Sequence, residues 1–319
     1  MKTLRLHGAR DLRLHDEPPP EPGDGEVLVR VTAVGLCGSD RHWYEEGGIG
    51  DAVLTRPLVL GHEFVGVIAE GDRAGARVAV DPAIPCGSCA PCHAGDSHLC
   101  LRMRFAGHGS TDGALRTQLA WPAELAHPLP DSLPDDEATL LEPLGVALHA
   151  LDLGHVEHGT TACVIGCGPV GLLLIQALRA AGAASVAASD PLPHRLAAAV
   201  ALGATPLGDS VDVAFETAGE DDAVDAAIAA ARPGGRVVLV GIPTNDRTSF
   251  TASAARRKGL TLLLSRRMRA SDLPRAIRLV ESGAVATESL VTARYPIDDF
   301  ADAFDEFDAQ RGLKVVVHP

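Results

Sequence analysis

Aromatic side chains are scarce in this chain: phenylalanine, tryptophan and tyrosine make up only 3% of its 319 residues. Proteins that bind single-stranded nucleic acids usually stack bases on such rings, so the scarcity argues against that function. Basic residues are also few, with 28 Lys and Arg against 42 Asp and Glu, and the net charge is -14. Because such a surface repels polyanions, we expect neither nucleic acid nor an anionic membrane as a partner.

Long hydrophobic runs are absent as well. Apolar stretches such as Val170–Ala177 are far shorter than the roughly 20 residues that span a bilayer as a helix. Residues 1–13 mix charges with short apolar pieces and lack the continuous hydrophobic segment of a signal peptide. We therefore expect a cytoplasmic protein with no membrane span.

The composition that is present fits a soluble enzyme or binding protein. A hydrophobic content of 46% with 22% charged residues is ordinary for a globular protein, and the length is enough for two domains. The seven cysteines are an odd number, and four of them crowd between positions 86 and 100. In a cytoplasmic chain this crowding favours metal binding over disulfides.

The crowded cysteines follow a C-x2-C-x2-C-x7-C pattern in a loop rich in glycine and proline, and they are Cys86, Cys89, Cys92 and Cys100. Four thiolates at this spacing can close a tetrahedral shell around zinc with no open position, which is typical of a structural site. An iron–sulfur cluster is the alternative, but its bacterial motif places the last cysteine after three residues and before a proline. We predict structural zinc, with disulfides the least favoured reading.

A second group of possible ligands is shorter and more ambiguous. Cys37, which is followed by Gly38-Ser39-Asp40, and the pair His62-Glu63 offer a thiolate, an imidazole and a carboxylate. These three ligand types can hold a catalytic zinc and leave one coordination position open. Two plainer interpretations remain: Cys37 ends an apolar run and could fill the core, and His62-Glu63 could be a paired group on the surface.

The first part of the chain predicts an irregular β domain. Short apolar and alternating runs are interrupted by proline and glycine, and the Cys37 region and residues 45–51 read as loops. The strands expected here are residues 2–6, 12–15, 27–34, 64–69 and 77–80.

The sequence pattern changes near residue 145. A buried-strand pattern at residues 161–165 leads into Gly166-Cys-Gly-Pro-Val-Gly171, and a helix is expected at residues 172–181. A second strand, residues 185–189, ends at Asp190, about twenty residues further on, as the dinucleotide fingerprint requires. The glycines would let the backbone approach a pyrophosphate at the helix N-terminus. Alternatively, they only form a tight turn.

Further strands and helices alternate through the second half of the chain, which predicts a parallel, doubly wound sheet. The expected strands are residues 211–215, 236–241, 260–264 and 313–317, and the expected helices are residues 194–202, 221–231 and 273–281.

Taken together, these motifs resemble the zinc-dependent medium-chain dehydrogenase/reductases of the alcohol dehydrogenase superfamily over nearly the whole chain. The motifs are Cys37-Gly-Ser-Asp40, Gly61-His-Glu63, the four-cysteine loop, Leu141-Glu-Pro-Leu144, Gly166–Gly171 and Arg232-Pro-Gly-Gly-Arg236. The resemblance implies an α/β protein with a GroES-like catalytic domain over residues 1–145, completed by residues 266–319. A Rossmann domain over residues 146–265 is inserted between them.

Within this family the chain is most similar to the sorbitol (L-iditol) dehydrogenase branch. Simple alcohol dehydrogenases have a cysteine where this chain has Glu142, and Glu63 directly after His62 also fits the polyol pattern. The resemblance implies that Cys37, His62 and Glu63 bind the catalytic zinc and that Glu142 binds it or holds its water. It also implies homo-oligomers, dimers or tetramers, and NAD contacts by these residues: Gly166, Gly168, Pro169, Val170, Gly171, Asp190 and Arg195.

The implied reaction is oxidation of a secondary alcohol of a polyol or sugar by NAD, with zinc as the Lewis acid. Ser39 and His42 are expected to relay the proton, with Glu142 as the competing route. Asp40 is expected to orient His62. The relay residues could instead be a loop serine and a surface histidine. The alternative functions are oxidation of a diol, an aldose or threonine, or NAD binding without catalysis.

Overall fold

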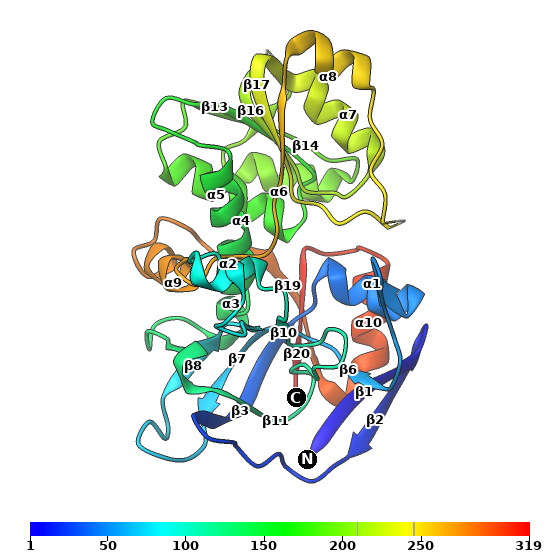
Figure 1. The fold of residues 1–319 in the computed structure, drawn as a ribbon, viewed down its shortest axis with the longest axis vertical. Helices are drawn as coiled ribbons and strands as arrows, with labels where there is room; N and C mark the ends of the chain where they lie inside the picture. The colour runs from blue at the N-terminus through cyan, green and yellow to red at the C-terminus, as the bar shows by residue number, and fades with distance from the viewer. Residues whose placement is uncertain (209, 245) are drawn as a thin grey trace. The chain divides into compact units, whose positions relative to one another are not determined.

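The structure is a computed structural model that describes residues 1–208, 210–244 and 246–319 (Figure 1). The chain divides into two compact units. Unit 1 holds Met1–Glu142, Leu273–Glu281 and Thr287–Pro319, and unit 2 holds Pro143–Asp272 and Ser282–Ala286. The domain limits expected after residues 145 and 265 stay predictions of where independently folding domains begin and end.

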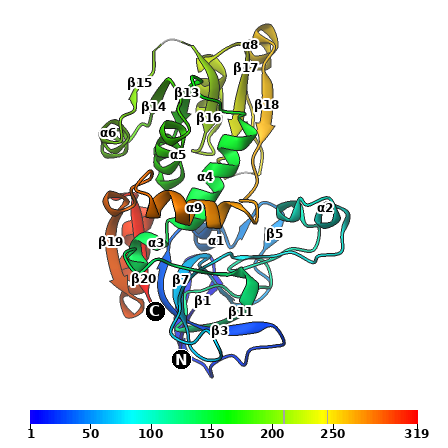
Figure 2. The same cartoon turned by 90° about the vertical axis from the view of Figure 1, so that its left-hand side faces the viewer.

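Unit 1 is built on a mixed sheet that has seven strands among the described residues, in the order β12-β8-β7-β3-β20-β19, with β11 also paired to β3. The C-terminal strand β20 lies antiparallel to β3 and parallel to β19. Both chain ends therefore belong to unit 1 (Figures 1 and 2). The strands are β3 (Glu26–Gly35), β7 (Glu63–Ile68), β8 (Arg77–Val80), β11 (Gln118–Pro122), β12 (Ala126–Pro128), β19 (Val291–Pro296) and β20 (Lys314–His318).

Smaller elements surround this sheet. A second sheet joins β1 (Lys2–Gly8), β2 (Asp11–Asp16) and β6 (Leu58–Val59), and two short ribbons pair β4 (Gly48–Ile49) with β5 (Ala52–Val53) and β9 (Ala83–Ile84) with β10 (Arg104–Phe105). The helices are α1 (Gly38–Glu46), α2 (Ala90–His93), α3 (Asp135–Ala138), α9 (Asp272–Glu281) and α10 (Phe300–Asp308), with 3-10 turns at Ser97–Leu99, Ala123–Leu125, Glu288–Leu290 and Ile297–Asp299.

A hydrophobic core of unit 1 draws on both ends of the chain. Trp43 from α1, Phe64 from β7 and Phe304 from α10 are all at most 2% exposed. They pack in one cluster with Leu4 and Val317. Burial of each large apolar side chain stabilises the fold by about 1.5 to 3 kcal/mol, so the C-terminal segment contributes substantially to unit 1.

Unit 2 contains the expected parallel sheet. Its six strands, among the described residues, follow the order β15-β14-β13-β16-β17-β18, and β18 lies at one edge (Figure 2). Helices α5 and α6 pack on β13 and β14, while α7 and α8 pack on β16 and β17. The elements are β13 (Thr161–Ile165), α5 (Pro169–Ala180), β14 (Ser185–Ser189), α6 (Pro193–Ala201), β15 (Thr205–Pro206), β16 (Val211–Glu216), α7 (Asp221–Ala230), β17 (Ala231–Leu239), α8 (Ala252–Lys258) and β18 (Thr261–Leu264). The α/β fold class, with an irregular β part and a Rossmann-type sheet, is confirmed.

Two helices correct the sequence interpretation. The segment after Cys37 is helix α1 rather than a loop, because the Asp40 carboxylate accepts the backbone N–H of Cys37 at 3.0 Å and fixes the first turn. The helix ends at Gly47, whose φ of 71° is left-handed. A helix that the sequence did not suggest, α4 (Leu141–Leu153), also begins beside Glu142.

Candidate active site

Cys37, His62 and Glu63 converge in unit 1, although the first and the second of them are 25 positions apart in the chain. One possible ligand atom from each lies within 4.8 Å of the others. His62 and Glu63 are only 5% and 0% exposed, so the alternative of a surface pair is wrong. The pairing of Gly35 with Glu63 between strands β3 and β7 brings the two segments together.

Asp40 ties the two ligand segments to each other. One carboxylate oxygen accepts the backbone N–H of Cys37, and the other accepts the backbone N–H of Gly61 at 3.2 Å. The second oxygen also lies 3.5 Å from Nδ1 of His62. The expected contact between Asp40 and His62 is thus present, and it leaves Nε2 of the imidazole as the atom that faces a ligand.

The electrostatics of His62 fit a cation site. Burial alone would lower the pKa of this imidazole, but the Asp40 carboxylate, with help from Cys37, outweighs burial and raises the pKa well above its usual value. Ser39 lies on the other side, with its Oγ 3.3 Å from Nε2. The surroundings of the imidazole therefore favour a positive charge, which a bound metal ion would also supply.

Glu63 is held from one side only. Its Oε2 accepts from the ammonium group of Lys314, while its Oε1 is buried and has no hydrogen-bond partner. Gly35 makes room for this carboxylate, because a Cβ at that position would lie 2.4 Å from Oε2. An unsatisfied buried carboxylate oxygen beside a thiol and an imidazole fits the ligand set of a site for a divalent cation.

Glu142 is a further buried carboxyl in this surrounding. It is 7% exposed, and burial raises its pKa to about 7. The neighbouring negative charges of Glu63 and Asp81 also raise the pKa, whereas His62 and Lys314 lower it. A carboxyl that is half-protonated near neutral pH can bind a cation or exchange a proton.

His42 lies on α1, one turn away from Ser39. Its Nδ1 is 3.1 Å from Oε1 of Glu46, and its side chain is 16% exposed. The structure thus places Ser39 at the imidazole of His62 and pairs His42 with a carboxylate. The relay that was expected to join Ser39 to His42 stays a prediction.

The four cysteines of the 86–100 loop also come together. The sulfur atoms of Cys89 and Cys92 lie 3.4 Å apart, and those of Cys89 and Cys100 lie 3.8 Å apart. One tetrahedral zinc with Zn–S bonds near 2.3 Å needs sulfur atoms about 3.8 Å apart. Arg102 stabilises thiolate charge, since its guanidinium lies 3.4 Å from the sulfur of Cys86. All seven cysteines of the chain are free thiols in the structure.

The glycine-rich loop of unit 2 has the geometry that its spacing predicts. Gly166 directly follows β13 and has a left-handed φ of 98°, and Gly168 precedes the first turn of α5, where Pro169 and Val170 begin the helix. At Gly171 a Cβ would lie 2.0 Å from the carbonyl oxygen of Gly166. The turn therefore requires glycine at positions 166 and 171, and its backbone is shaped as a loop that approaches a phosphate would be.

Asp190 and Arg195 lie beside this loop. The Asp190 carboxylate follows β14 and accepts the backbone N–H groups of Cys167 at 2.6 Å and Leu192 at 2.8 Å. Arg195 lies on α6, and its Nη1 is 3.9 Å from the place where a Cβ of Gly168 would be. Asp190 thus has a fixed position next to the glycine turn, as a residue that binds ribose hydroxyls must have.

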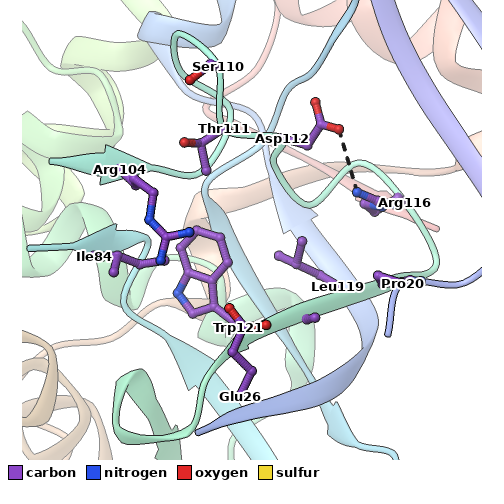
Figure 3. A pocket seen from close by; sticks show the side chains of 11 residues that line it. Pro20, Glu26, Ile84, Arg104, Ser110, Thr111, Asp112, Arg116, Leu119 and Trp121 are labelled. Carbon is purple, nitrogen blue, oxygen red and sulfur yellow. Dashed lines mark ion pairs between the residues drawn. The ribbon is translucent and has the colours of Figure 1, made fainter. Parts of the chain in front are cut away.

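The structure also has a surface hollow of about 320 Å³ in unit 1, lined by Arg104, Asp112, Arg116 and Trp121 among others (Figure 3). None of the candidate metal ligands lines it. The Trp121 ring is 3% exposed, and its N–H donates to the carbonyl of Asp81, so the ring serves the core. The hollow is separate from the metal centre.

Sequence reasoning missed two residues that contact these sites. Lys314 meets Glu63 from 251 positions away, and the only signal was a lysine at the start of an apolar strand. Thr217, directly after strand β16, donates its hydroxyl hydrogen to the carbonyl of Gly166 at 2.7 Å and fixes the glycine turn. No local pattern pointed to Thr217.

Known proteins show the same organisation. Residues 23–131 match the family described as the alcohol dehydrogenase GroES-like domain, and residues 206–282 match the family described as zinc-binding dehydrogenase. The sorbitol dehydrogenase of Bacillus subtilis (strain 168) is 34% identical, with 100% of this chain and 97% of that protein covered. The D-xylulose reductase A of Aspergillus oryzae is 35% identical, with coverage of 98% and 95%.

A solved structure of a related enzyme agrees with these sequence matches. The alcohol dehydrogenase of E. coli CFT073 in complex with NADH superposes with a TM-score of 0.89 at 29% identity, and 100% of this chain and 99% of that chain are covered. The chain therefore belongs to the zinc-dependent medium-chain dehydrogenase/reductase family, in the branch of the sorbitol dehydrogenases. The expected enzyme class, an oxidoreductase with zinc and NAD as cofactors, is confirmed at the level of the family. No helix in the described ranges is long and apolar enough to cross a membrane.

Proposed function

We propose that this enzyme oxidises a secondary hydroxyl of a polyol or sugar to a ketone with NAD, at a zinc ion held by Cys37, His62 and Glu63. The observation that carries the proposal is the convergence of these three side chains with an unpartnered, buried Oε1 on Glu63. The relatives named sorbitol dehydrogenase and D-xylulose reductase support a polyol as the substrate.

When bound, zinc supplies a Lewis acid that lowers the pKa of the substrate hydroxyl, and NAD accepts the hydride. The protein's own residues hold the site. Asp40 fixes the tautomer and orientation of His62 so that Nε2 faces the metal. Glu142 binds the metal directly or holds a water molecule there. A set of three protein ligands leaves a position for the substrate.

The proton of the hydroxyl leaves through polar side chains on α1. Ser39 takes part through its Oγ beside His62, and His42 passes the proton on toward solvent with Glu46 as its partner. Glu142 is the alternative acceptor, because a buried carboxyl next to the metal ligands can take the proton without a relay. Substituting the Ser39 and His42 pair, and separately Glu142, distinguishes the two routes according to which substitution lowers turnover.

NAD is bound by the loop Gly166–Gly171 with Asp190 and Arg195 beside it. Free N–H groups at the start of α5 attract the pyrophosphate, and Asp190 accepts hydrogen bonds from the adenosine ribose. A carboxylate at that place repels the 2′-phosphate of NADP, so NAD is the preferred cofactor. The E. coli structure with NADH supports this assignment.

A second zinc in the loop of Cys86, Cys89, Cys92 and Cys100 serves the fold. We further infer a homo-oligomer, a dimer or tetramer, in the cytoplasm. Strand β18 is an edge strand, and its Leu264 is 79% exposed, which supports pairing of that edge with a second copy. Light scattering coupled to size-exclusion chromatography measures the number of subunits in the oligomer.

The test compares ligand variants in metal content and turnover. Wild-type protein should bind about two zinc ions per chain, whereas Cys37→Ala and His62→Ala should retain one and lose turnover of sorbitol and xylitol with NAD. Cys163→Ala is the matched control, since Cys163 is a fully buried cysteine outside both metal groups. Variants that keep two zinc ions and full turnover would sink the assignment. Wild type with one zinc and no turnover would indicate an NAD-binding protein without catalysis.

A further inference from the structure

Lys314 is a buried charge to which the proposed chemistry assigns no task. Its side chain is 1% exposed and belongs to β20, where the next residues are valines. The ammonium group donates to the Glu63 carboxylate and, at 3.0 Å, to the carbonyl oxygen of Leu36. Burying an ammonium group is costly unless it is paired, so these two contacts are what keeps the lysine there.

Three adjacent strands bring these groups together. Strand β3 lies between β7 and β20, and its Gly35 pairs with Glu63 on one side and with Val316 on the other. The backbone N–H of Leu36 donates to the carbonyl of Val315 at 2.9 Å. The lysine therefore reaches across the end of β3 and contacts both segments that carry the candidate metal ligands.

The contacts give the two oxygen atoms of Glu63 different partners. Oε2 is taken by Lys314, and Oε1 is buried without a hydrogen-bond partner. The side chain has little freedom to exchange the two atoms, because the position of Gly35 lies against Oε2. Only Oε1 is left for a metal ion.

We propose that Lys314 is a positioning residue of the metal centre, which holds Oε2 of Glu63 and the carbonyl before Cys37 so that Glu63 offers the metal a single oxygen. The inference rests on the proposed zinc site. A carboxylate that bound through both oxygens would add a donor and fill the position that the substrate hydroxyl needs. Lys314 itself touches no reacting atom.

Cobalt(II) provides a readout other than activity. Protein that carries zinc in the four-cysteine loop and cobalt at Cys37 should absorb strongly in the visible range, as four-coordinate cobalt does. In Lys314→Met the absorption should fall toward that of five-coordinate cobalt, and the affinity for the metal should drop by about 10-fold or more. Lys314→Arg keeps the charge and the hydrogen-bond donors, so it should retain most of the absorption and most of the metal affinity.

Two controls separate positioning from simple stabilisation. Lys258→Met removes another lysine, whose Nζ donates to the carbonyls of Ile228, Ala229 and Ala231, so it should lower stability without changing the cobalt spectrum. If Lys314→Met fails to fold, Lys314→Gln takes its place with the same expected result. A folded variant with the wild-type spectrum and affinity would overturn the inference alone. Wild type that takes up no cobalt outside the cysteine loop would overturn the zinc site as well.

Discussion

The carboxylate of Asp40 lies 3.5 Å from Nδ1 of His62 and also accepts the backbone N–H groups of Cys37 and Gly61. One side chain thereby orients an imidazole and joins the two segments that carry the candidate metal ligands. It is fully buried, and its position on the first turn of α1 explains why a helix begins directly after Cys37. The candidate metal site is thus organised by a residue that need not contact a metal ion itself.

Asp40→Asn should weaken zinc binding at Cys37 and His62. The amide keeps an oxygen and the shape but loses the charge that favours the correct state of His62, and such outer contacts are typically worth about 10- to 100-fold in metal affinity. Competition with a chelator measures the change, and the zinc of the four-cysteine loop serves as the internal reference. Equal loss of both ions would indicate unfolding instead.

Glu142→Gln should remove a pH dependence from the metal-free protein. The folded protein holds a proton on Glu142 up to its pKa of about 7, whereas the unfolded chain releases it near 4.5. The stabilisation is therefore complete below pH 4.5 and is lost as the pH rises through 7. At about 1.4 kcal/mol per pKa unit the loss is on the order of 3 kcal/mol.

Urea unfolding of the metal-free protein between pH 5 and pH 8 measures this effect. Wild type should lose stability across the range, and Glu142→Gln should lose much less between pH 5 and pH 6.5, below the range in which the raised pKa of His62 also lowers stability. Glu281→Gln, at an exposed position, should behave as wild type. An unchanged slope in Glu142→Gln would show that another group causes the dependence.

Gly171→Ala should damage the nucleotide loop of the folded protein itself. The added Cβ would lie 2.0 Å from the Gly166 carbonyl oxygen, so both the melting temperature and NAD affinity should fall, the latter by about tenfold for every 1.4 kcal/mol of lost binding. Gly168→Ala is the matched comparison, because its Cβ would meet nothing closer than 3.9 Å. It should keep the melting temperature and lose affinity only through the approaching phosphate. Thermal unfolding distinguishes the two variants, and calorimetric titration measures their affinity for NAD. An equal fall in melting temperature would refute this account of the loop.

Cys89→Ser should remove the zinc of the four-cysteine loop and lower the melting temperature, since the loop packs its short helix α2 around this cluster. The cobalt spectrum at Cys37 should be unchanged in this variant. Metal analysis together with thermal unfolding checks the prediction. Retention of two zinc ions per chain would mean that the three remaining cysteines are enough to bind zinc in this loop.

Much of this could be predicted from the sequence because the motifs are local. The spacing of the four cysteines and of the glycines in the loop Gly166–Gly171 is enough to predict their chemistry. The alternating strands and helices of unit 2 are predicted by the periodicity of their hydrophobic residues. Helix α1 was missed because it is mostly polar: its stability comes from the buried Trp43 and the Asp40 contact, which a sequence window cannot show.

Contacts between residues that are far apart in the chain could not be predicted from the sequence either. Lys314 meets Glu63 only because β20 returns to pair with β3, and nothing near either residue encodes that register. Thr217 meets Gly166 for a similar reason, since β16 lies next to β13. Such contacts depend on strand order, and strand order is a property of the whole fold.

The most direct test of the account is reduction of NAD by the zinc-loaded enzyme across sugar alcohols, vicinal diols, aldoses, simple alcohols and threonine, repeated with NADP. We expect strong turnover of a sugar alcohol with NAD and little with NADP, and loss of that turnover in Cys37→Ala. Turnover of a simple alcohol or threonine with no sugar alcohol accepted would contradict the proposed substrate, and equal use of NADP would contradict the role of Asp190.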